Sequence, residues 1–208
     1  SRQVLQAKRG YMRLLLATRN AGKLKEFREL MSGLPIECTF LSELGIAEEI
    51  AETGKTFLEN AILKARGYAA LSGLVTLADD SGLEVDALGG APGVQSARWA
   101  GPDASDMDRI RLLLGRLRGV PPEQRGAQFR CVAAMATPGG QVCTTEGAIR
   151  GEIIDTPRGT LGFGYDPVFV PEGFACTFAE LPAADKNGLS HRGQALRRAV
   201  ALGLFRDL

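Results

Sequence analysis

The chain of 208 residues is long enough for one large domain or for two lobes that share a core, and its 45% hydrophobic and 24% charged residues are typical of a globular protein. The formal net charge is +1 and the 25 basic residues are scattered, which excludes the basic surface that duplex nucleic acid or an anionic membrane requires and leaves a small anionic ligand open. The 4 cysteines are widely spaced and a single histidine cannot complete a zinc site with them, so we expect reduced, mostly buried thiols in a cytoplasmic protein.

The first residues place basic side chains before an apolar run, which is the order found in a signal peptide. Arg19 interrupts the run, and the run is too short for the apolar segment of such a signal, so we expect no export. Residues 1–11 are interpreted as an N-terminal extension or a remnant of cloning, and Met12 as the expected natural start.

The first half of the chain predicts a strand, a helix, a strand and a second helix. Residues 13–17 form a short apolar run, and over residues 21–31 the apolar period lengthens to that of a helix. Residues 36–40 are compatible with a strand. The capping-box pattern Thr56-x-x-Glu59 predicts the start of a helix that continues to about Leu71. We expect its buried stripe to contain Leu58, Ile62, Ala65 and Ala69.

The middle of the chain predicts a strand, a loop and a helix. Residues 74–78 are an apolar run that we expect to end at Asp79 and Asp80, before a Ser-Gly turn. Residues 89–102 are rich in glycine and proline and contain the only tryptophan, so they predict a loop. A helix is expected over residues 107–117.

The last third predicts a hairpin, a strand and a final helix. Residues 128–137 and 141–149 are β-like runs that flank a Gly-Gly pair, which is a hairpin signal. A further strand is expected over residues 165–170, and Ser190 is expected to cap the last helix. Strands and helices mix without strict alternation, so the predicted fold class is α/β, with some α+β character, built on a mixed sheet.

The segment TRNAGK, residues 18–23, joins the first strand to the first helix. It resembles a Walker A loop in which Ala17 replaces the first glycine and Leu24 replaces the hydroxyl residue that binds Mg²⁺. A helix N-terminus offers unpaired N–H groups and a positive dipole end, to which Lys23 adds a charge. The segment therefore predicts either a phosphate site or a capped helix with an exposed lysine.

Two groups of acidic residues follow. Asp79 and Asp80 come at the predicted carboxyl end of a strand, where ligands bind to open α/β sheets. Glu48, Glu49 and Glu52 precede a Thr-Gly turn. Mg²⁺ usually takes one or two carboxylates together with substrate phosphates, so one acid from each group would suffice. The alternative for each group is a solvated turn.

Two later segments suggest contacts to a base. Residues 159–167 combine glycines with aromatic residues and could present Phe163 as a stacking surface, although a packed core phenylalanine is the alternative. Lys186, His191 and Arg192 gather around a predicted helix start. Their N–H donors suit the keto oxygens of a base, and a structural histidine is the alternative.

Five motifs carry a family resemblance because they occur together and in order. They are TRNAGK at 18–23, IAETGKTFLENAILKA at 50–65, ADDSGLEVDALGGAPGVQSARWAG at 78–101, GFGYDPVF at 162–169 and SHRGQAL at 190–196. Over about residues 12–206 the chain resembles the inosine triphosphate pyrophosphatase family, which removes non-standard purine nucleoside triphosphates from the nucleotide pool.

The resemblance implies a fold and a reaction. Residues 12–208 would form a single domain with an elongated mixed sheet and two lobes around a central nucleotide cleft, and the protein would be a homodimer. It would require Mg²⁺ and would hydrolyse ITP, dITP and XTP between the α and β phosphates, which yields a nucleoside monophosphate and pyrophosphate.

The resemblance also implies roles for individual residues. Glu52 and Asp80 would hold Mg²⁺, and Asp80 would accept the proton from the attacking water. The implied substrate contacts are Thr18, Arg19, Asn20, Ala21, Gly22, Lys23, Lys64 and Ser81, the base-side residues Phe163, Gly164, Tyr165 and Asp166, and the pocket residues Lys186, His191 and Arg192. Ala51 departs from the motif, because many relatives carry a second acid there, so a supporting carboxylate is either missing or supplied by Glu49.

Two alternative functions follow from the same motifs. One is a Maf-like pyrophosphatase that acts on other nucleotides, and the segments SHRG and GFGYDP favour the purine enzyme over it. The other is a nucleotide-binding regulator without turnover. The presence of both Glu52 and Asp80 argues against the regulator, because binding alone needs no base.

Overall fold

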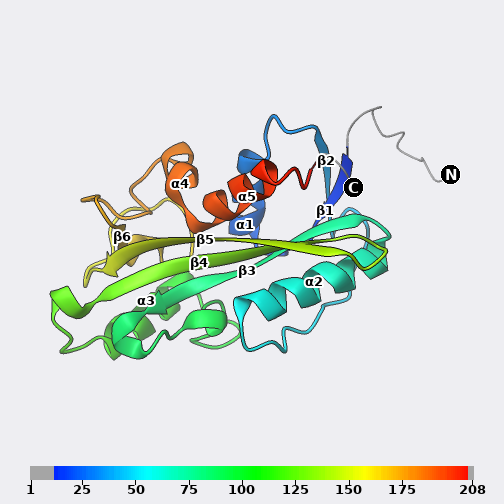
Figure 1. The fold of residues 1–208 in the computed structure, drawn as a ribbon. Coiled ribbons are helices and arrows are strands. Elements are labelled where there is room, and N and C mark those ends of the chain that lie inside the picture. Colours follow the sequence, from blue (N-terminus) through cyan, green and yellow to red (C-terminus); the bar gives the residue numbers. More distant parts are fainter. Residues whose placement is uncertain (1–11, 206–208) are drawn as a thin grey trace. The chain divides into compact units, whose positions relative to one another are not determined.

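The computed structural model describes residues 12–205, and within this range six strands form a mixed sheet in the order β2-β1-β3-β4-β5-β6 (Figure 1). The strands are β1 (Met12–Leu16), β2 (Ile36–Phe40), β3 (Val75–Val85), β4 (Gly126–Ala136), β5 (Val142–Ile153) and β6 (Phe169–Pro171). β1 pairs in parallel with β2 and with β3, whereas β5 and β6 are antiparallel. The predicted α/β class with a mixed sheet is confirmed.

Five α-helices and four short 3-10 helices complete the secondary structure of the described residues. The α-helices are α1 (Ala21–Leu30), α2 (Phe57–Ser72), α3 (Asp106–Arg116), α4 (Ala183–Leu189) and α5 (His191–Ala201). The 3-10 helices are Asp86–Leu88, Gly93–Gln95, Pro122–Gln124 and Asp166–Val168.

The chain forms two compact units. Unit 1 contains the described residues 12–79, 133–145 and 197–205, and unit 2 contains residues 80–132 and 146–196. β3, β4, β5 and α5 each contribute residues to both units.

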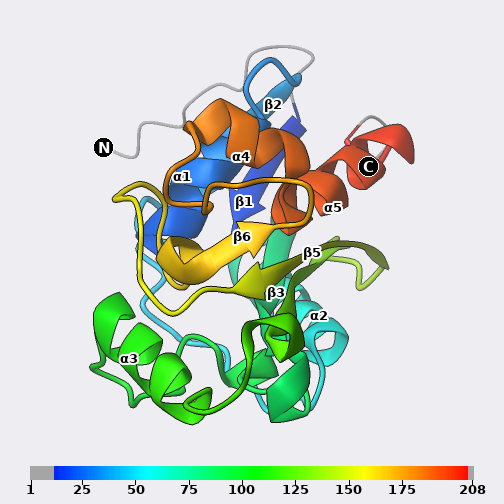
Figure 2. The same ribbon diagram turned by 90° about the vertical axis from the view of Figure 1, so that its left-hand side faces the viewer.

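Unit 1 is built on the parallel strands at the start of the chain. Leu14, Leu15 and Leu16 of β1 are fully buried, and α1 and α2 cover opposite faces of the sheet (Figures 1 and 2). Thr56 caps α2 with the predicted capping box. The apolar residues that α2 buries are Phe57, Ala61, Ala65, Tyr68 and Ala69. The predicted stripe was therefore wrong at Leu58, which is 46% exposed, and Ile62 is only half-buried, because the buried face begins one residue earlier.

Unit 2 has an aromatic core. The ring of Phe129 packs edge-on against Phe169, with 4.7 Å between centroids, and is stacked with Phe178 at 5.9 Å. α3 inserts Ile110 and Leu113 into this core, and Leu117 follows directly after the helix. Trp99, from the predicted loop, is partly buried and packs against the same cluster.

The expected end of β3 at Asp79 and Asp80 was wrong, because the strand continues to Val85. The Ser-Gly pair does not form a turn. Gly82 instead lets a neighbouring segment approach the strand, since an added Cβ would lie 2.4 Å from both the Gly93 carbonyl oxygen and Ser96 Oγ. Ser96 Oγ accepts a hydrogen bond from the Leu83 N–H at 2.9 Å. The two acids therefore lie in the middle of a strand.

The expected strand over residues 165–170 is shorter than predicted. Asp166–Val168 forms a 3-10 helix, and only Phe169–Pro171 pairs with β5. Pro167 explains the difference, because proline has no N–H to donate to a sheet. α4, which carries Lys186, was not predicted at all. The hairpin of β4 and β5 and the Ser190 cap of α5 are confirmed, the latter by a bond of 3.1 Å from the Gly193 N–H to Ser190 Oγ.

The cysteines are free thiols, but the expectation that they are mostly buried was wrong. Cys131 is buried, Cys38 and Cys176 are half-buried, and Cys143 is exposed on β5. Burial raises the pKa of the Cys38 thiol, which keeps it protonated.

The expected extension at residues 1–11 lies outside the described residues. No helix within residues 12–205 combines the length and the apolar character needed to cross a membrane.

Candidate active site

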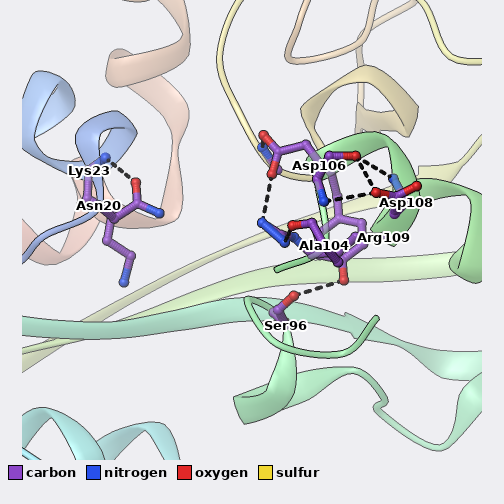
Figure 3. A network of polar contacts seen from close by, with 10 residues as sticks. Asn20, Lys23, Ser96, Ala104, Asp106, Asp108 and Arg109 are labelled. Carbon is purple, nitrogen blue, oxygen red and sulfur yellow. Dashed lines mark hydrogen bonds and ion pairs between the residues drawn. The ribbon is translucent and has the colours of Figure 1, made fainter. Parts of the chain in front are cut away.

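The phosphate-side loop, residues 18–23, joins β1 to α1 and is shaped by short-range hydrogen bonds. Asn20 caps the helix, because its Oδ1 accepts from the Lys23 N–H at 3.0 Å (Figure 3). Thr18 Oγ1 accepts from the Asn20 N–H at 3.2 Å. The first turn of α1 contains no acidic residue, so nothing there opposes an anion at the positive end of the helix.

Arg19, a predicted substrate contact, binds the protein itself. Its Nη2 donates to the carbonyl oxygens of Ile46 at 2.9 Å and Glu48 at 3.0 Å. The guanidinium thus connects the phosphate-side loop to the segment that leads into the acidic motif around Glu52.

Lys23 is held by the first of the two acids on β3. Its Nζ lies 2.9 Å from Asp79 Oδ2, and the Asp79 side chain is fully buried while that of Lys23 is 15% exposed. An ammonium has three N–H donors, so binding to Asp79 leaves donor capacity for a phosphate oxygen. Asp79 therefore orients the lysine.

The segment around Glu52 is fixed to α2. Lys64 Nζ donates to Glu52 Oε1 at 2.8 Å. The Gly54 N–H donates to Oδ1 of the buried Asn60 at 2.8 Å. An added Cβ at Gly54 would lie 2.6 Å from Glu59 Cβ, which explains the glycine. The structure thus brings a predicted metal ligand and a predicted substrate contact together.

Asp80, the predicted base, is only 6% exposed. Its Oδ1 accepts from the Ser81 N–H at 3.2 Å. Ser81 Oγ in turn accepts from Arg192 Nη2 at 2.8 Å, and Arg192 is 2% exposed. Three predicted site residues from β3 and α5 are therefore joined by hydrogen bonds within unit 2.

The base-side loop, residues 162–166, is organised around a buried ion pair. Asp166 Oδ2 lies 2.5 Å from Lys186 Nζ and also accepts from the Phe163 N–H at 2.8 Å. Lys186 Nζ lies 5.0 Å from the centroid of the Phe163 ring, and Arg192 Cζ lies 5.8 Å from it. Both distances suit cation–π contacts. Phe163 itself is half-buried, so part of its surface is accessible.

Tyr165 and His191 contact the interior of unit 2. The Tyr165 hydroxyl donates to the Ser96 carbonyl oxygen at 3.0 Å, and burial raises the pKa of this phenol above its ordinary 10.0. The His191 ring is stacked with Phe129, with 4.9 Å between centroids and an interplanar angle of 11°. The substrate contacts predicted for Tyr165 and His191 stay predictions.

Several residues in these clusters were not assigned a role from the sequence. They are Asn60, Asp79, Ser96 and Asp106. Asn60 shares a helix face with Thr56 and Lys64, and Asp79 adjoins the predicted base, so both had a local signal. Ser96 and Asp106 act through contacts distant in sequence, and nothing local identifies them.

The acids fit Mg²⁺ by their chemistry. Within residues 12–205 no group of three or more Asp, Glu, His or Cys side chains is arranged as a metal centre. Glu52 belongs to unit 1 and Asp80 to unit 2, and each carries a carboxylate, a ligand that Mg²⁺ takes in ones and twos beside waters and substrate phosphates. Their role as metal ligands stays a prediction.

A helix N-terminus with a lysine beside it, as in unit 1, suits a phosphate. A partly accessible aromatic ring, as in unit 2, suits a base, and each feature is typical of proteins that bind nucleoside phosphates. Comparison with known proteins narrows this class. The sequence profile of the Ham1 family matches residues 14–202. The chain belongs to the Ham1 family, and the resemblance inferred from the five motifs is confirmed.

Individual relatives match along nearly their whole length. A dITP/XTP pyrophosphatase of Geobacter sulfurreducens is 51% identical over 88% of this chain and 92% of its own. One of Bacillus licheniformis is 46% identical over 91% of this chain and 96% of its own. The solved structure of a HAM1 protein from Coxiella burnetii is 43% identical, with a TM-score of 0.83 over 92% of this chain and 98% of its own.

Proposed function

We propose that this protein hydrolyses the purine nucleoside triphosphates ITP, dITP and XTP to the monophosphate and pyrophosphate, in the presence of Mg²⁺, and so cleanses the nucleotide pool. The enzyme class, a nucleoside triphosphate pyrophosphatase, follows from membership of the Ham1 family and from relatives of that name at 46% and 51% identity. The observation that carries the residue assignment is the ion pair between Lys23 and Asp79, which separates the roles of the two consecutive acids.

The proposed mechanism gives the two acids on β3 different tasks. Asp79 holds Lys23, whose ammonium neutralises the triphosphate at the N-terminus of α1. Asp80 orients a water and takes its proton as the water oxygen attacks the α-phosphorus. The bond from the α-phosphorus to the bridging oxygen breaks, and pyrophosphate leaves with that oxygen. Positioning and charge neutralisation dominate this kind of reaction.

Glu52 and Asp80 would hold Mg²⁺, which when bound neutralises negative charge on the phosphates. Without bound Mg²⁺, Lys64 balances the charge of Glu52, since its ammonium lies 2.8 Å from the Glu52 carboxylate. Ala51 supplies no second carboxylate at this point, so Glu52 is the acid of this segment to which we assign metal binding.

The proposed preference for a 6-keto purine rests on the donors near Phe163. A base stacked on this ring would lie near the cations of Lys186 and Arg192, whose Nζ and Cζ atoms are 5.0 and 5.8 Å from the ring centroid. These cations donate but do not accept, so the 6-amino group of adenine would leave them unpaired. Guanine shares the 6-keto group, so these donors do not explain discrimination against GTP, which is proposed on the family resemblance alone. His191, next to Arg192 at the start of α5, is proposed to assist.

A homodimer in the cytoplasm is also proposed, on the family resemblance. Light scattering after size exclusion tests the first point, and a monomer at micromolar concentration would contradict it.

The deciding experiment measures pyrophosphate release with Mg²⁺ from ITP, XTP, dITP, GTP, ATP and dTTP at equal concentrations. We expect fast release from the first three and little from the others, with Asp80→Asn inactive throughout. Activity on dTTP alone would favour the Maf-like alternative. Binding of ITP without release of pyrophosphate would favour the regulator.

A further inference from the structure

We propose that Asp106 is a positioning residue that sets the pose of the base-side loop and thereby the affinity for the purine base. The inference rests on the proposed function, because it takes the base to stack on Phe163. Asp106 lies 58 residues before the glycine that it binds, and no motif of the sequence contains it.

Asp106 bridges the first turn of α3 and the base-side loop. Its Oδ2 accepts a hydrogen bond from the Gly164 N–H at 2.7 Å. Its Oδ1 lies 3.2 Å from Arg109 Nη2, and Arg109 Nη1 also donates to the Ala104 carbonyl oxygen (Figure 3). The guanidinium therefore fixes the orientation of the carboxylate, so that its other oxygen faces the loop.

The loop is held at its neighbouring residues from other directions. Asp166 accepts from the Phe163 N–H, and the Tyr165 hydroxyl donates to Ser96. Asp106 accepts the hydrogen bond from the N–H of Gly164, the residue between Phe163 and Tyr165. Gly164 has a φ of +63°, a left-handed conformation that other residues adopt at a cost, so the direction of its N–H depends on both the glycine and its acceptor. Together these bonds fix the peptide that follows Phe163.

The support beneath Asp106 is rigid. α3 places Ile110 and Leu113 in the core of unit 2, with exposures of 1% and 0%. Ser105 and Asp108 form a capping box at the start of the same helix. An acceptor on a helix that is packed and capped in this way can hold a loop more firmly than an acceptor on another loop can.

The contact should affect the base and not the phosphates. Phe163 is flanked by Lys186 and Arg192, which are the donors assigned to the base, whereas the phosphate contacts are assigned to residues 18–23. Loss of the bond to Gly164 would let the peptide rotate, and the Phe163 ring would leave the position in which these cations face it. Of the two products, only the monophosphate carries the base, so only the binding of the monophosphate should depend on this contact.

The test compares product inhibition by IMP and by pyrophosphate, together with KM and kcat for ITP. In Asp106→Ala we expect the inhibition constant of IMP and the KM for ITP to rise about 10-fold, the size expected for loss of one hydrogen bond to a charged group. The inhibition constant of pyrophosphate and kcat should change less than about twofold. Asp106→Asn retains an oxygen acceptor and should restore most of the affinity for IMP.

Asp108→Asn is the matched control, because it removes a negative charge from the same turn but no bond to the loop. It should leave IMP inhibition as in the wild type. Gly164→Ala alters the residue whose N–H donates to Asp106 and should weaken IMP inhibition selectively, as Asp106→Ala does. Unchanged IMP inhibition in Asp106→Ala, equal loss for IMP and pyrophosphate, or the same loss in Asp108→Asn would overturn the inference.

The outcome is separable from that of the proposed function. A wild-type protein that releases no pyrophosphate from any nucleotide would refute the proposed function. An active wild type whose Asp106→Ala and Gly164→Ala variants both retain its affinity for IMP would refute only the positioning role.

Discussion

The phosphate-side loop and the base-side loop are held in place by different kinds of contact. In the first, Thr18, Asn20 and Lys23 close the turn over separations of two and three residues, and Asn20 is exposed. The side chains of Arg19 and Lys23 also bind partners that are distant in sequence, but the turn itself is shaped locally. In the second, Asp166, Gly164 and Tyr165 bind partners 20, 58 and 69 residues away, respectively. The polar core of the second loop is buried, with Lys186 and Asp166 at 4% and 3% exposure.

The difference matches what each loop is proposed to recognise. A triphosphate is common to all nucleotides, so a helix N-terminus and a lysine can bind it without discrimination. A base must be distinguished from similar bases, which requires donors held in one place by surrounding structure. The variants below test this contrast, from the largest expected effect to the smallest.

Asp80→Asn tests whether chemistry depends on one carboxylate that belongs to neither loop. Loss of the proton acceptor should lower kcat by roughly 10²- to 10⁴-fold, measured at saturating Mg²⁺ and ITP because Asp80 is also assigned to the metal. Single-turnover measurement of pyrophosphate release checks this. Glu84→Gln, which alters another carboxylate of β3, is the control and should retain kcat. A near-native kcat in Asp80→Asn would rule out the assigned role.

Asp166→Asn tests the buried ion pair of the base-side loop. Removing one partner of a buried pair typically costs about 3–5 kcal/mol, and we expect a loss of this size in the free energy of unfolding in urea. The control is Asp86→Asn at the surface, where Asp86 lies 2.6 Å from Arg150 but its side chain is 54% exposed. That pair should contribute less than about 1 kcal/mol. An equal loss of unfolding free energy in Asp166→Asn and Asp86→Asn would show that burial does not make the ion pair of the base-side loop more important for stability.

Asn20→Ala tests the local character of the phosphate-side loop. Loss of an N-cap typically costs about 1 kcal/mol, and the inhibition constant of pyrophosphate should also rise because the first turn of α1 loses its fixed geometry. Ser105→Ala removes the cap of α3 and serves as the comparison. It should cost similar stability with unchanged inhibition by pyrophosphate. An unchanged inhibition constant of pyrophosphate in Asn20→Ala would show that the cap does not contribute to phosphate binding.

Tyr165→Phe tests the base-side loop through its pH dependence. The pKa of Tyr165 is raised above 10.0 in the folded protein, so the folded state keeps a proton that the unfolded state loses at high pH. The contribution of Tyr165 to stability is therefore complete below pH 10.0 and declines as the pH rises further. The gap in unfolding free energy between wild type and variant should narrow above this pH. A gap that stays constant would contradict the burial of the phenol.

The same contrast explains what the sequence could predict. Thr56 and Ser190 cap their helices as expected, and Asn20 caps α1, because capping depends on residues only three positions away. The position of Asp79 and Asp80 within a strand could not be inferred, since β3 continues through a Ser-Gly pair at a point where Ser96, which is distant in sequence, packs against Gly82. Asp106 had no local signal for the same reason, because its partner in the base-side loop is distant in sequence.

The position of Trp99 gives the molecule an optical asymmetry. The indole is the only one in the chain, and it packs against the aromatic core of unit 2. Fluorescence excited at the red edge of protein absorption therefore originates in that unit alone. Unit 1 is silent at those wavelengths, and its folding is visible only through backbone signals such as far-ultraviolet circular dichroism. The natural sequence thus supplies a reporter for the half of the chain that contains the base-side loop, without any label.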